Sequence, residues 1–150
     1  MGKGSTKVDR INEILQETIS SIEDSREEIV EIVEHTRIEY KSAEEELNRI
    51  KEKVDKIISE VDLLEREESK SRTYLSTVSK NFSIYTEKDI KEAYDKANSI
   101  RIKLLLKRKE EKTLIERRRD KELRLMSALE VYKKAEKVGK SVSVATEYLK

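Results

Sequence analysis

The sequence predicts an all-α fold: a long antiparallel two-helix coiled-coil hairpin that dimerises into a four-helix bundle at its open end. Three observations predict it: a seven-residue apolar repeat in the first half, a capping signal that starts a second helix, and few helix-breaking residues. Of the 150 residues, 43% are charged, three are glycine and none is proline. That composition is typical of coiled coils and long helices.

The first predicted helix covers about residues 6–80 and carries apolar side chains at most a and d positions of a heptad. The a positions are Asn12, Ile19, Arg26, Val33, Tyr40, Leu47, Val54, Val61, Glu68, Leu75 and Phe82, and the d positions are Val8, Leu15, Ile22, Ile29, Thr36, Ala43, Ile50, Ile57, Leu64, Ser71 and Val78. A strict seven-residue repeat keeps one seam facing a partner helix. At about 1.5 Å of rise per residue, this helix would extend for roughly 110 Å.

The predicted turn covers residues 81–86. Thr86, followed three residues later by Asp89, resembles a capping box, in which each side chain satisfies a free backbone donor of the other. Tyr85 and Ile90 occupy the two positions of a hydrophobic staple. A connection this short makes neighbouring helices antiparallel.

The second predicted helix covers about residues 87–149 and continues the apolar pattern. Its seam residues are Ile90, Ala93, Ala97, Ile100, Leu104, Leu114, Leu125, Ala128, Tyr132, Ala135, Val142 and Leu149. With a turn centred near residues 83–84, facing residues have numbers that sum to about 167. We therefore expect Leu104 near Leu63 and Leu64. The acidic residues 44–46 should face a basic cluster of residues 117–124.

The charges of the two predicted helices are opposite in sign. Residues 1–82 contain 20 acidic and 14 basic side chains, whereas residues 83–150 contain 12 acidic and 19 basic ones. The two helices can therefore attract each other over much of their length. Exposed pairs contribute only tenths of a kcal/mol each, so charge sets the register while the apolar seam supplies stability.

Besides Arg26, charged residues occupy five further seam positions where an apolar side chain is expected: Glu68, Lys107, Glu111, Arg118 and Lys121. They weaken the packing and are candidate switch positions, at which two registers or crossing angles lie close in energy. A partner or a modification would then shift the balance, and the second helix would rotate or shift near its end.

A broad apolar stripe near the start of the first helix predicts a further partner. Ile11, Ile29, Val30, Ile32 and Val33 cover more of the helix surface than one neighbouring helix would bury. Two hairpins that pack at their open ends are the simplest arrangement that covers this stripe. The sequence therefore predicts a homodimer.

Several segments resemble a known family. They are 75–82 (LSTVSKNF), 85–90 (YTEKDI), 93–97 (AYDKA), 116–120 (ERRRD) and 147–149 (EYL). Together they resemble the N-terminal sensory region of the DegS-type sensor histidine kinases of Bacillus and its relatives. The resemblance implies a membrane-free, dimeric parent kinase that uses ATP to phosphorylate a histidine. The resemblance also implies that this parent kinase passes the phosphate to a response regulator of the DegU type.

The resemblance also implies that the kinase module lies in cis, beyond Lys150. With glycine only at positions 2, 4 and 139, the chain cannot form a glycine-rich nucleotide loop. We therefore expect no enzymatic activity and no cofactor in this chain, and ATP only in the parent. No cysteine, no signal peptide and no apolar run of about 20 residues are present, so we expect a cytoplasmic protein without membrane contact.

Two side chains are candidates for phosphorylation. His35 is the only histidine, but it falls at a solvent-facing c position and is followed by Thr36 instead of an acidic residue. A solvated surface histidine is the preferred interpretation. Ser76 falls at an exposed b position with Arg72 one turn before it, and a phosphate there would loosen the turn. Ser76 is therefore the candidate regulatory phosphosite, although serines also favour helix ends.

Two surface features leave alternatives open. The aromatic residues Tyr74, Phe82, Tyr85 and Tyr94 either pack the turn or form a contact patch for a regulatory protein at the hairpin tip. The segment 101–124 has 11 basic and 5 acidic residues without an aromatic side chain. A solvated face paired with glutamates is preferred over nucleic-acid binding there. A scaffolding coiled coil and an RNA-binding helical arm are the alternative functions.

Overall fold

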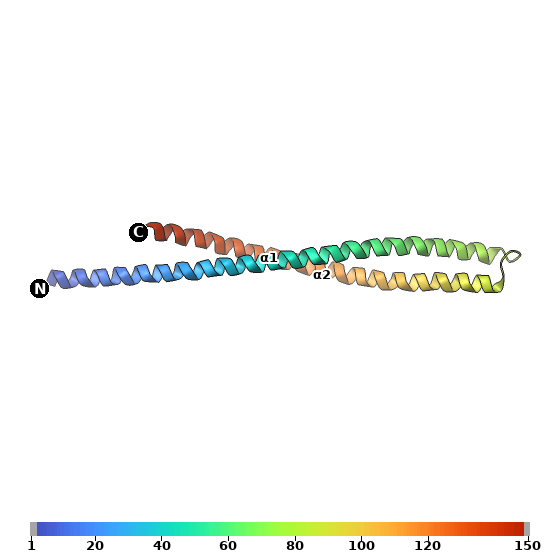
Figure 1. The fold of residues 1–150 in the computed structure, drawn as a ribbon, viewed down its shortest axis with the longest axis horizontal. Helices are drawn as coiled ribbons and strands as arrows, with labels where there is room; N and C mark the ends of the chain where they lie inside the picture. Colours follow the sequence, from blue (N-terminus) through green and yellow to red (C-terminus); the bar gives the residue numbers. More distant parts are fainter. Residues whose placement is uncertain (1–2, 149–150) are drawn as a thin grey trace. The chain divides into compact units, whose positions relative to one another are not determined.

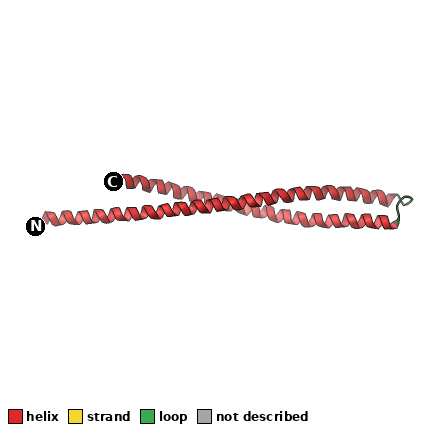
Figure 2. Ribbon diagram, in the orientation of Figure 1, coloured by secondary structure: helices red, strands yellow, loops and turns green. Residues whose placement is uncertain are grey.

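The structure, a computed structural model, describes residues 3–148, with side chains from Thr6 onward. This part of the chain forms two α-helices, α1 (Lys3–Lys80) and α2 (Glu87–Tyr148), and contains no strand. The two helices pack against each other and are joined by one short loop (Figures 1 and 2). The predicted all-α helical hairpin is confirmed. The predicted seam residue Leu149 lies outside the described residues.

The chain divides into two compact units, which we describe separately. The turn unit comprises Glu46–Glu122, and the terminal unit comprises Met1–Glu45 together with Leu123–Lys150. Each unit contains a segment of α1 and a segment of α2. The prediction that residues 1–150 form one sensory domain stays a prediction.

The turn unit contains most of the buried apolar side chains. They follow the predicted heptad: Leu47, Val54, Ile57, Val61 and Val78 on α1, and Ala93, Ile100 and Leu104 on α2. Leu104 packs with Ile57 and Val61, and Leu64 and Leu114 pack against this cluster. Burial of each large aliphatic side chain contributes about 1.5–3 kcal/mol, so this seam holds the two helices together.

The turn between the helices is built from local hydrogen bonds. The Asn81 carbonyl accepts bonds from the backbone N–H groups of Ile84 and Tyr85, both at 3.1 Å. At the start of α2, the Thr86 N–H donates to Asp89 Oδ2 at 3.0 Å, and the Asp89 N–H donates to Thr86 Oγ1 at 3.3 Å. The predicted capping box is therefore confirmed. It satisfies backbone donors that the first turn of a helix leaves free.

The terminal unit buries its seam only in part. Thr36 and Ala43 on α1 and Thr146 on α2 are buried, whereas Ile22 is half-buried. Every described side chain from residue 6 to 21 is exposed. Within this unit α1 continues past the end of α2 (Figure 1), so the first part of the predicted seam has no helix beside it.

Two expectations about packing near the turn are wrong. Phe82, predicted as the last a position of the seam, lies in the loop after Lys80 and is 74% exposed. Leu63, expected near Leu104, is 58% exposed, while Leu64 makes the contact. The heptad repeat ends with the helix, because a side chain beyond the last helical turn no longer projects along the seam.

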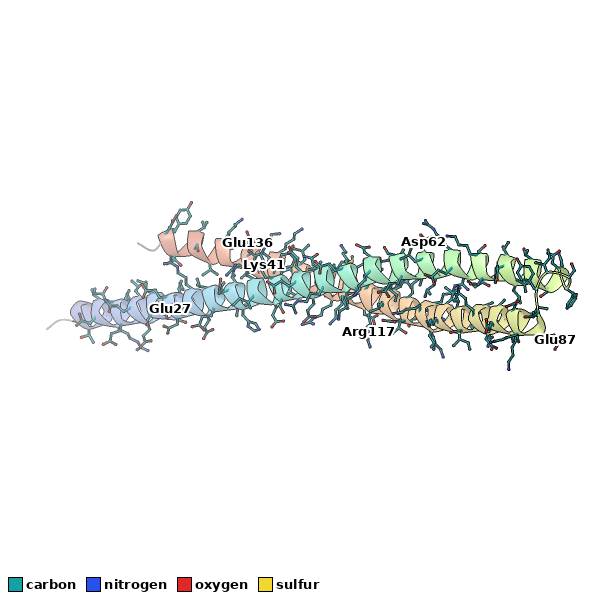
Figure 3. The ribbon with its side chains drawn as sticks, turned by 45° about the vertical axis from the view of Figure 1, so that its right-hand side comes forward. Glu27, Lys41, Asp62, Glu87, Arg117 and Glu136 are labelled. Carbon is teal, nitrogen blue, oxygen red and sulfur yellow. The ribbon has the colours of Figure 1, made fainter. Side chains whose placement is uncertain are left out.

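The outer surfaces of both helices are charged, as their side chains show in Figure 3. Asp62, exposed on α1, pairs with Arg66 one turn further along the same helix at 2.9 Å. Neither helix, as far as it is described, contains a segment long and apolar enough to span a bilayer.

Candidate functional site: the charged seam

The five candidate switch positions all lie on the seam. Glu68 on α1 and Lys107, Glu111, Arg118 and Lys121 on α2 are half-buried and keep the heptad register of the buried apolar positions, at multiples of seven residues from them. The seam of the turn unit is therefore a row of apolar contacts interrupted by charged side chains. Whether these positions act as a switch stays a prediction.

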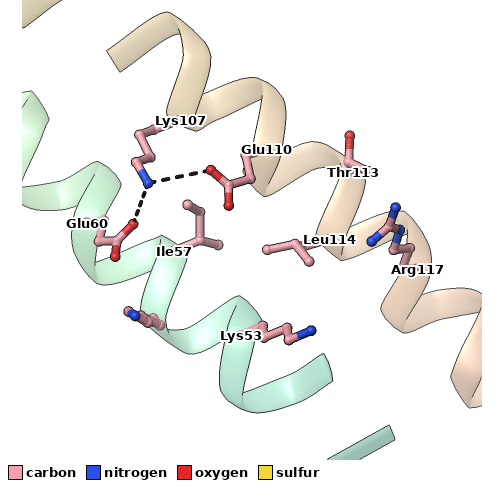
Figure 4. A pocket seen from close by; sticks show the side chains of 9 residues that line it. Lys53, Ile57, Glu60, Lys107, Glu110, Thr113, Leu114 and Arg117 are labelled. Carbon is pink, nitrogen blue, oxygen red and sulfur yellow. Dashed lines mark ion pairs between the residues drawn. The ribbon is translucent and has the colours of Figure 1, made fainter. Parts of the chain in front are cut away.

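Lys107 is held by two carboxylates. Its Nζ lies 3.0 Å from Glu60 Oε2 on α1 and 3.5 Å from Glu110 Oε2 on α2 (Figure 4). The hydrogen bond that Lys107 donates to Glu60 is the main cause that raises the pKa of Lys107 above its usual value, and the charges of Glu110 and Glu60 add to it. The ammonium group therefore joins the two helices in its charged form.

A second seam lysine makes a similar bond between the helices. Lys121 Nζ lies 2.8 Å from Glu46 Oε2, and both side chains are about one-third exposed. The residue numbers of this pair sum to 167, and so do those of Lys107 and Glu60. The Lys121–Glu46 pair confirms the predicted contact between the acidic residues 44–46 and the basic cluster of α2.

The remaining charged seam residues do not all join the helices. Glu68 pairs with Arg72 at 3.5 Å, and Arg118 pairs with Glu122 at 3.7 Å; each pair lies within one helix. The structure therefore divides the predicted set: Lys107 and Lys121 make ion pairs across the hairpin, whereas Glu68 and Arg118 pair along their own helices. Glu60, the partner of Lys107 on α1, was missed from the sequence, although the predicted register would have identified it.

An open groove of about 540 Å³ lies beside the Lys107 pair. Ile57 and Leu114 line it together with the basic residues Lys53, Lys56 and Arg117. Figure 4 shows Ile57 and Leu114 between the two helices. The carboxylates of Glu60 and Glu110 line the groove as well, so it carries charges of both signs. No group of three or more His, Cys, Asp or Glu that could hold a metal ion occurs in the described part of the chain.

The basic segment 101–124 is partly neutralised by α1. Besides Lys107 and Lys121, Arg108 lies 3.1 Å from Glu65, and Arg124 lies 4.0 Å from Glu39. Lys107 and Arg108 lie in the first half of the segment, and Lys121 and Arg124 lie at its end. The pairing agrees with the preferred interpretation of this segment as a face that meets the glutamates of α1.

The terminal unit brings aromatic rings together. Tyr40 on α1 and Tyr132 on α2 stack with ring centroids 5.9 Å apart and an interplanar angle of 7°. The charge of Glu44 is the main cause that raises the pKa of Tyr40. The ring pair links the two helices of this unit through an apolar contact.

A second groove, of about 690 Å³, lies in the terminal unit. The apolar side chains of Val30, Val33 and Val144 line it, together with Gly139. A Cβ atom added at Gly139 would lie 3.3 Å from Val33 Cγ2. This glycine therefore allows α1 and α2 to approach closely. Its role was missed from the sequence, although it follows the seam residue Tyr132 by seven positions.

The side chains proposed for modification are accessible. Ser76 is exposed in the last turn of α1, and His35 is exposed on the same helix. Ser76 stays a predicted phosphosite, and His35 is still interpreted as a surface residue.

The aromatic residues near the turn do not form one cluster. Tyr74 and Tyr85 meet edge to face with centroids 6.5 Å apart. Phe82 is 74% exposed and Tyr94 is 59% exposed. Of the two interpretations, packing of the turn is therefore wrong for Phe82 and Tyr94. Two exposed rings leave room for a protein contact at the tip.

Comparisons with known proteins agree on one family. A family model described as "Sensor protein DegS" matches residues 12–150. The chain is 34% identical over 146 residues to the signal transduction histidine-protein kinase/phosphatase DegS of Bacillus subtilis (strain 168). The match covers 96% of this chain and 38% of that protein. The chain is also 34% identical over 139 residues to DegS of Brevibacillus brevis, covering 93% of this chain and 36% of that protein. No solved structure matches.

Proposed function

This chain belongs to the DegS family of sensor proteins, and we propose that it is the signal-receiving, dimerising N-terminal part of a cytoplasmic sensor histidine kinase. The chain spans less than two-fifths of the curated relatives' length. In the proposed parent protein, the kinase module lies in cis and uses ATP, and its phosphate goes to a DegU-type response regulator. This chain itself senses and transmits, without catalysing a reaction.

The charged seam of the turn unit is the observation that carries the transmitting role. Lys107 and Lys121 join the helices by ion pairs at positions where apolar residues would pack more tightly. A half-buried ion pair contributes little net stability because desolvation offsets its attraction. Two arrangements of α2 against α1 can therefore lie close in free energy, and a bound partner or a phosphate on Ser76 selects one.

Replacement of the charged seam tests this role. In the full-length protein, Lys107, Arg118 and Lys121 are changed together to Leu, which should lock the hairpin in one arrangement. Two rates are then measured: autophosphorylation of the kinase, and dephosphorylation of a phosphorylated DegU-type regulator by the same protein. Their ratio reports the balance between the two activities. We expect a ratio fixed at one extreme.

A matched control separates switching from altered charge. The triple variant with Lys109, Lys112 and Arg119 changed to Leu removes the same charge from exposed positions of α2. It should leave the ratio within about twofold of the unaltered protein, because surface substitutions have small effects. Equal behaviour of the two triple variants would contradict the proposed transmission through the seam.

A further inference from the structure

The first turns of α1 form an arm without a neighbouring helix. We define the N-terminal arm as residues 7–21. Every side chain of the arm is exposed, and Ile22 is the first half-buried residue after it. The end of α2 lies further along, where Thr146 and Glu23 line one groove. No described residue of α2 therefore covers the arm.

The arm nevertheless keeps the seam pattern of the buried part of α1. Val8 and Leu15 occupy d positions and Ile19 an a position, and their exposed fractions are 55%, 53% and 37%. Apolar residues at this spacing need a second helix along the same stripe.

Asn12 identifies the second helix. It is the only polar residue among the arm's a and d positions. A single asparagine at an a position in a parallel two-stranded coiled coil sets register and strand number, because only a matching polar residue opposite it satisfies the buried amide. A second copy of this chain supplies that residue by symmetry.

The charges of the arm agree with a second copy in the same direction. In a parallel pair, each g position faces the e position five residues further along the other helix. Ile11 then faces Gln16 of the second copy, and Thr18 faces Glu23 of the second copy, so no like charges meet. The charged residues Arg10, Glu13 and Glu17 fall at the outer b and f positions.

We infer that the N-terminal arm is the homodimer contact of this protein: two arms pair in parallel and in register, with Asn12 against Asn12 of the second copy. This inference rests on the dimer in the proposed function and specifies its surface and direction. Because the end of α2 lies beside Glu23, parallel arms bring the C-terminal ends of both copies to the same end of the dimer. Two kinase modules would then begin side by side.

Single cysteines test the direction and the register, since the chain contains none of its own. Asn12→Cys and Ile19→Cys are prepared separately and oxidised at about 50 μM protein. Both should form disulfide-linked dimers in high yield, because a positions meet across a parallel two-fold axis. Glu17→Cys, at an outer f position of the same arm, is the matched control and should remain largely monomeric on a denaturing gel.

The outcomes distinguish this inference from the wider proposal. In an antiparallel pair, residues 12 and 19 cannot both meet their own copies, so a crosslink at only one position overturns the inference and leaves the homodimer standing. A monomer by sedimentation at the same concentration overturns both. Neither outcome alters the role of the charged seam, which kinase activity tests separately. If the crosslinks form in this chain but not in the full-length protein, another segment covers the arm and the inference is wrong.

Substitution of the asparagine tests its proposed role. Asn12→Val removes the polar pair, so association should tighten by about tenfold and larger assemblies should accompany the dimer. Glu13→Val, next to it on the outer face, should change neither quantity. Sedimentation equilibrium measures both, starting from a chain mass of 17.6 kDa. An unchanged association constant and a strict dimer in Asn12→Val would contradict the inference.

Discussion

The turn unit and the terminal unit share one heptad repeat but use it differently. In the turn unit the seam residues Val54, Ile57 and Leu104 are at most 3% exposed. In the terminal unit, Val8 and Leu15 occupy the same heptad positions and remain more than half exposed. The comparison shows that the repeat creates an apolar stripe, whereas burial depends on whether a second helix lies along it. The apolar seam of the turn unit is buried within one chain, whereas in the inferred dimer a second copy covers the exposed part of the terminal unit.

The largest effect should come from the apolar cluster of the turn unit. Leu104→Ala removes a side chain that packs with Ile57 and Val61, which should lower the free energy of unfolding by about 2–4 kcal/mol. Thermal and denaturant unfolding followed by circular dichroism measure the change. Leu105→Ala, at the neighbouring position that is 56% exposed, is the control. Similar losses in both variants would mean that the seam is not where the structure places it.

A smaller effect is expected at the close approach in the terminal unit. Gly139→Leu places a large side chain where even a Cβ would lie 3.3 Å from Val33 Cγ2. Overpacking of this kind costs about 1–3 kcal/mol. The rate of limited proteolysis near the end of α2 should rise, and the control Val138→Leu, at a half-exposed position, should not change it. Resistance to proteolysis in Gly139→Leu would show that the helices of this unit are further apart.

The coupling energies of ion pairs across the hairpin should also differ between the two units, but by less than the losses expected for Leu104→Ala and Gly139→Leu. A double-mutant cycle with alanine at Lys121 and Glu46 should give a coupling energy of about 0.5–1 kcal/mol. The pair Arg124–Glu39 in the terminal unit, at 4.0 Å and about half exposed, should give about 0.3 kcal/mol or less. Denaturant unfolding of the single and double variants supplies both values. The reverse order would contradict the tighter seam of the turn unit.

The smallest effect concerns pH and the cap of α2. The backbone hydrogen bond from Thr86, followed by its hydroxyl bond, lowers the pKa of Asp89. A lowered folded-state pKa stabilises the fold above the usual carboxyl pKa, and this contribution is lost as pH falls through the lower folded value. The stability difference between the unaltered chain and Asp89→Asn should therefore be present at pH 7 and disappear in strong acid.

Asp95→Asn, at an exposed position further along α2, is the control for that measurement. Unfolding curves between pH 7 and pH 2 follow both variants against the unaltered chain. A difference for Asp89→Asn that is constant over this range, or that grows in acid, would contradict the cap as the cause.

Local signals in the sequence were sufficient to predict the fold near the turn. Thr86 and Asp89 are three residues apart, and their bonds depend only on the backbone between them, so the start of α2 could be placed correctly. The register followed from the same turn, because a short loop leaves few ways to align the helices. That register places Lys121 opposite Glu46, as the structure does.

Other features depend on contacts that the repeat does not encode. Phe82 fits the heptad but lies beyond the end of α1, and Val8 fits it but has no helix beside it. Gly139 became informative only when its distance to Val33 was known. The repeat also does not show which charged seam residues pair between the helices. Lys107 pairs with Glu60 on the other helix, while Arg118 pairs with Glu122 on its own helix.

Hydrogen exchange at several protein concentrations tests the difference between the two units most directly. Backbone amides of residues 46–122 should show strong protection that does not change between about 1 and 100 μM, because this unit is complete in one chain. Protection within residues 7–21 should rise with concentration as a second helix covers the arm. Protection of both units that is equal and independent of concentration would contradict the account.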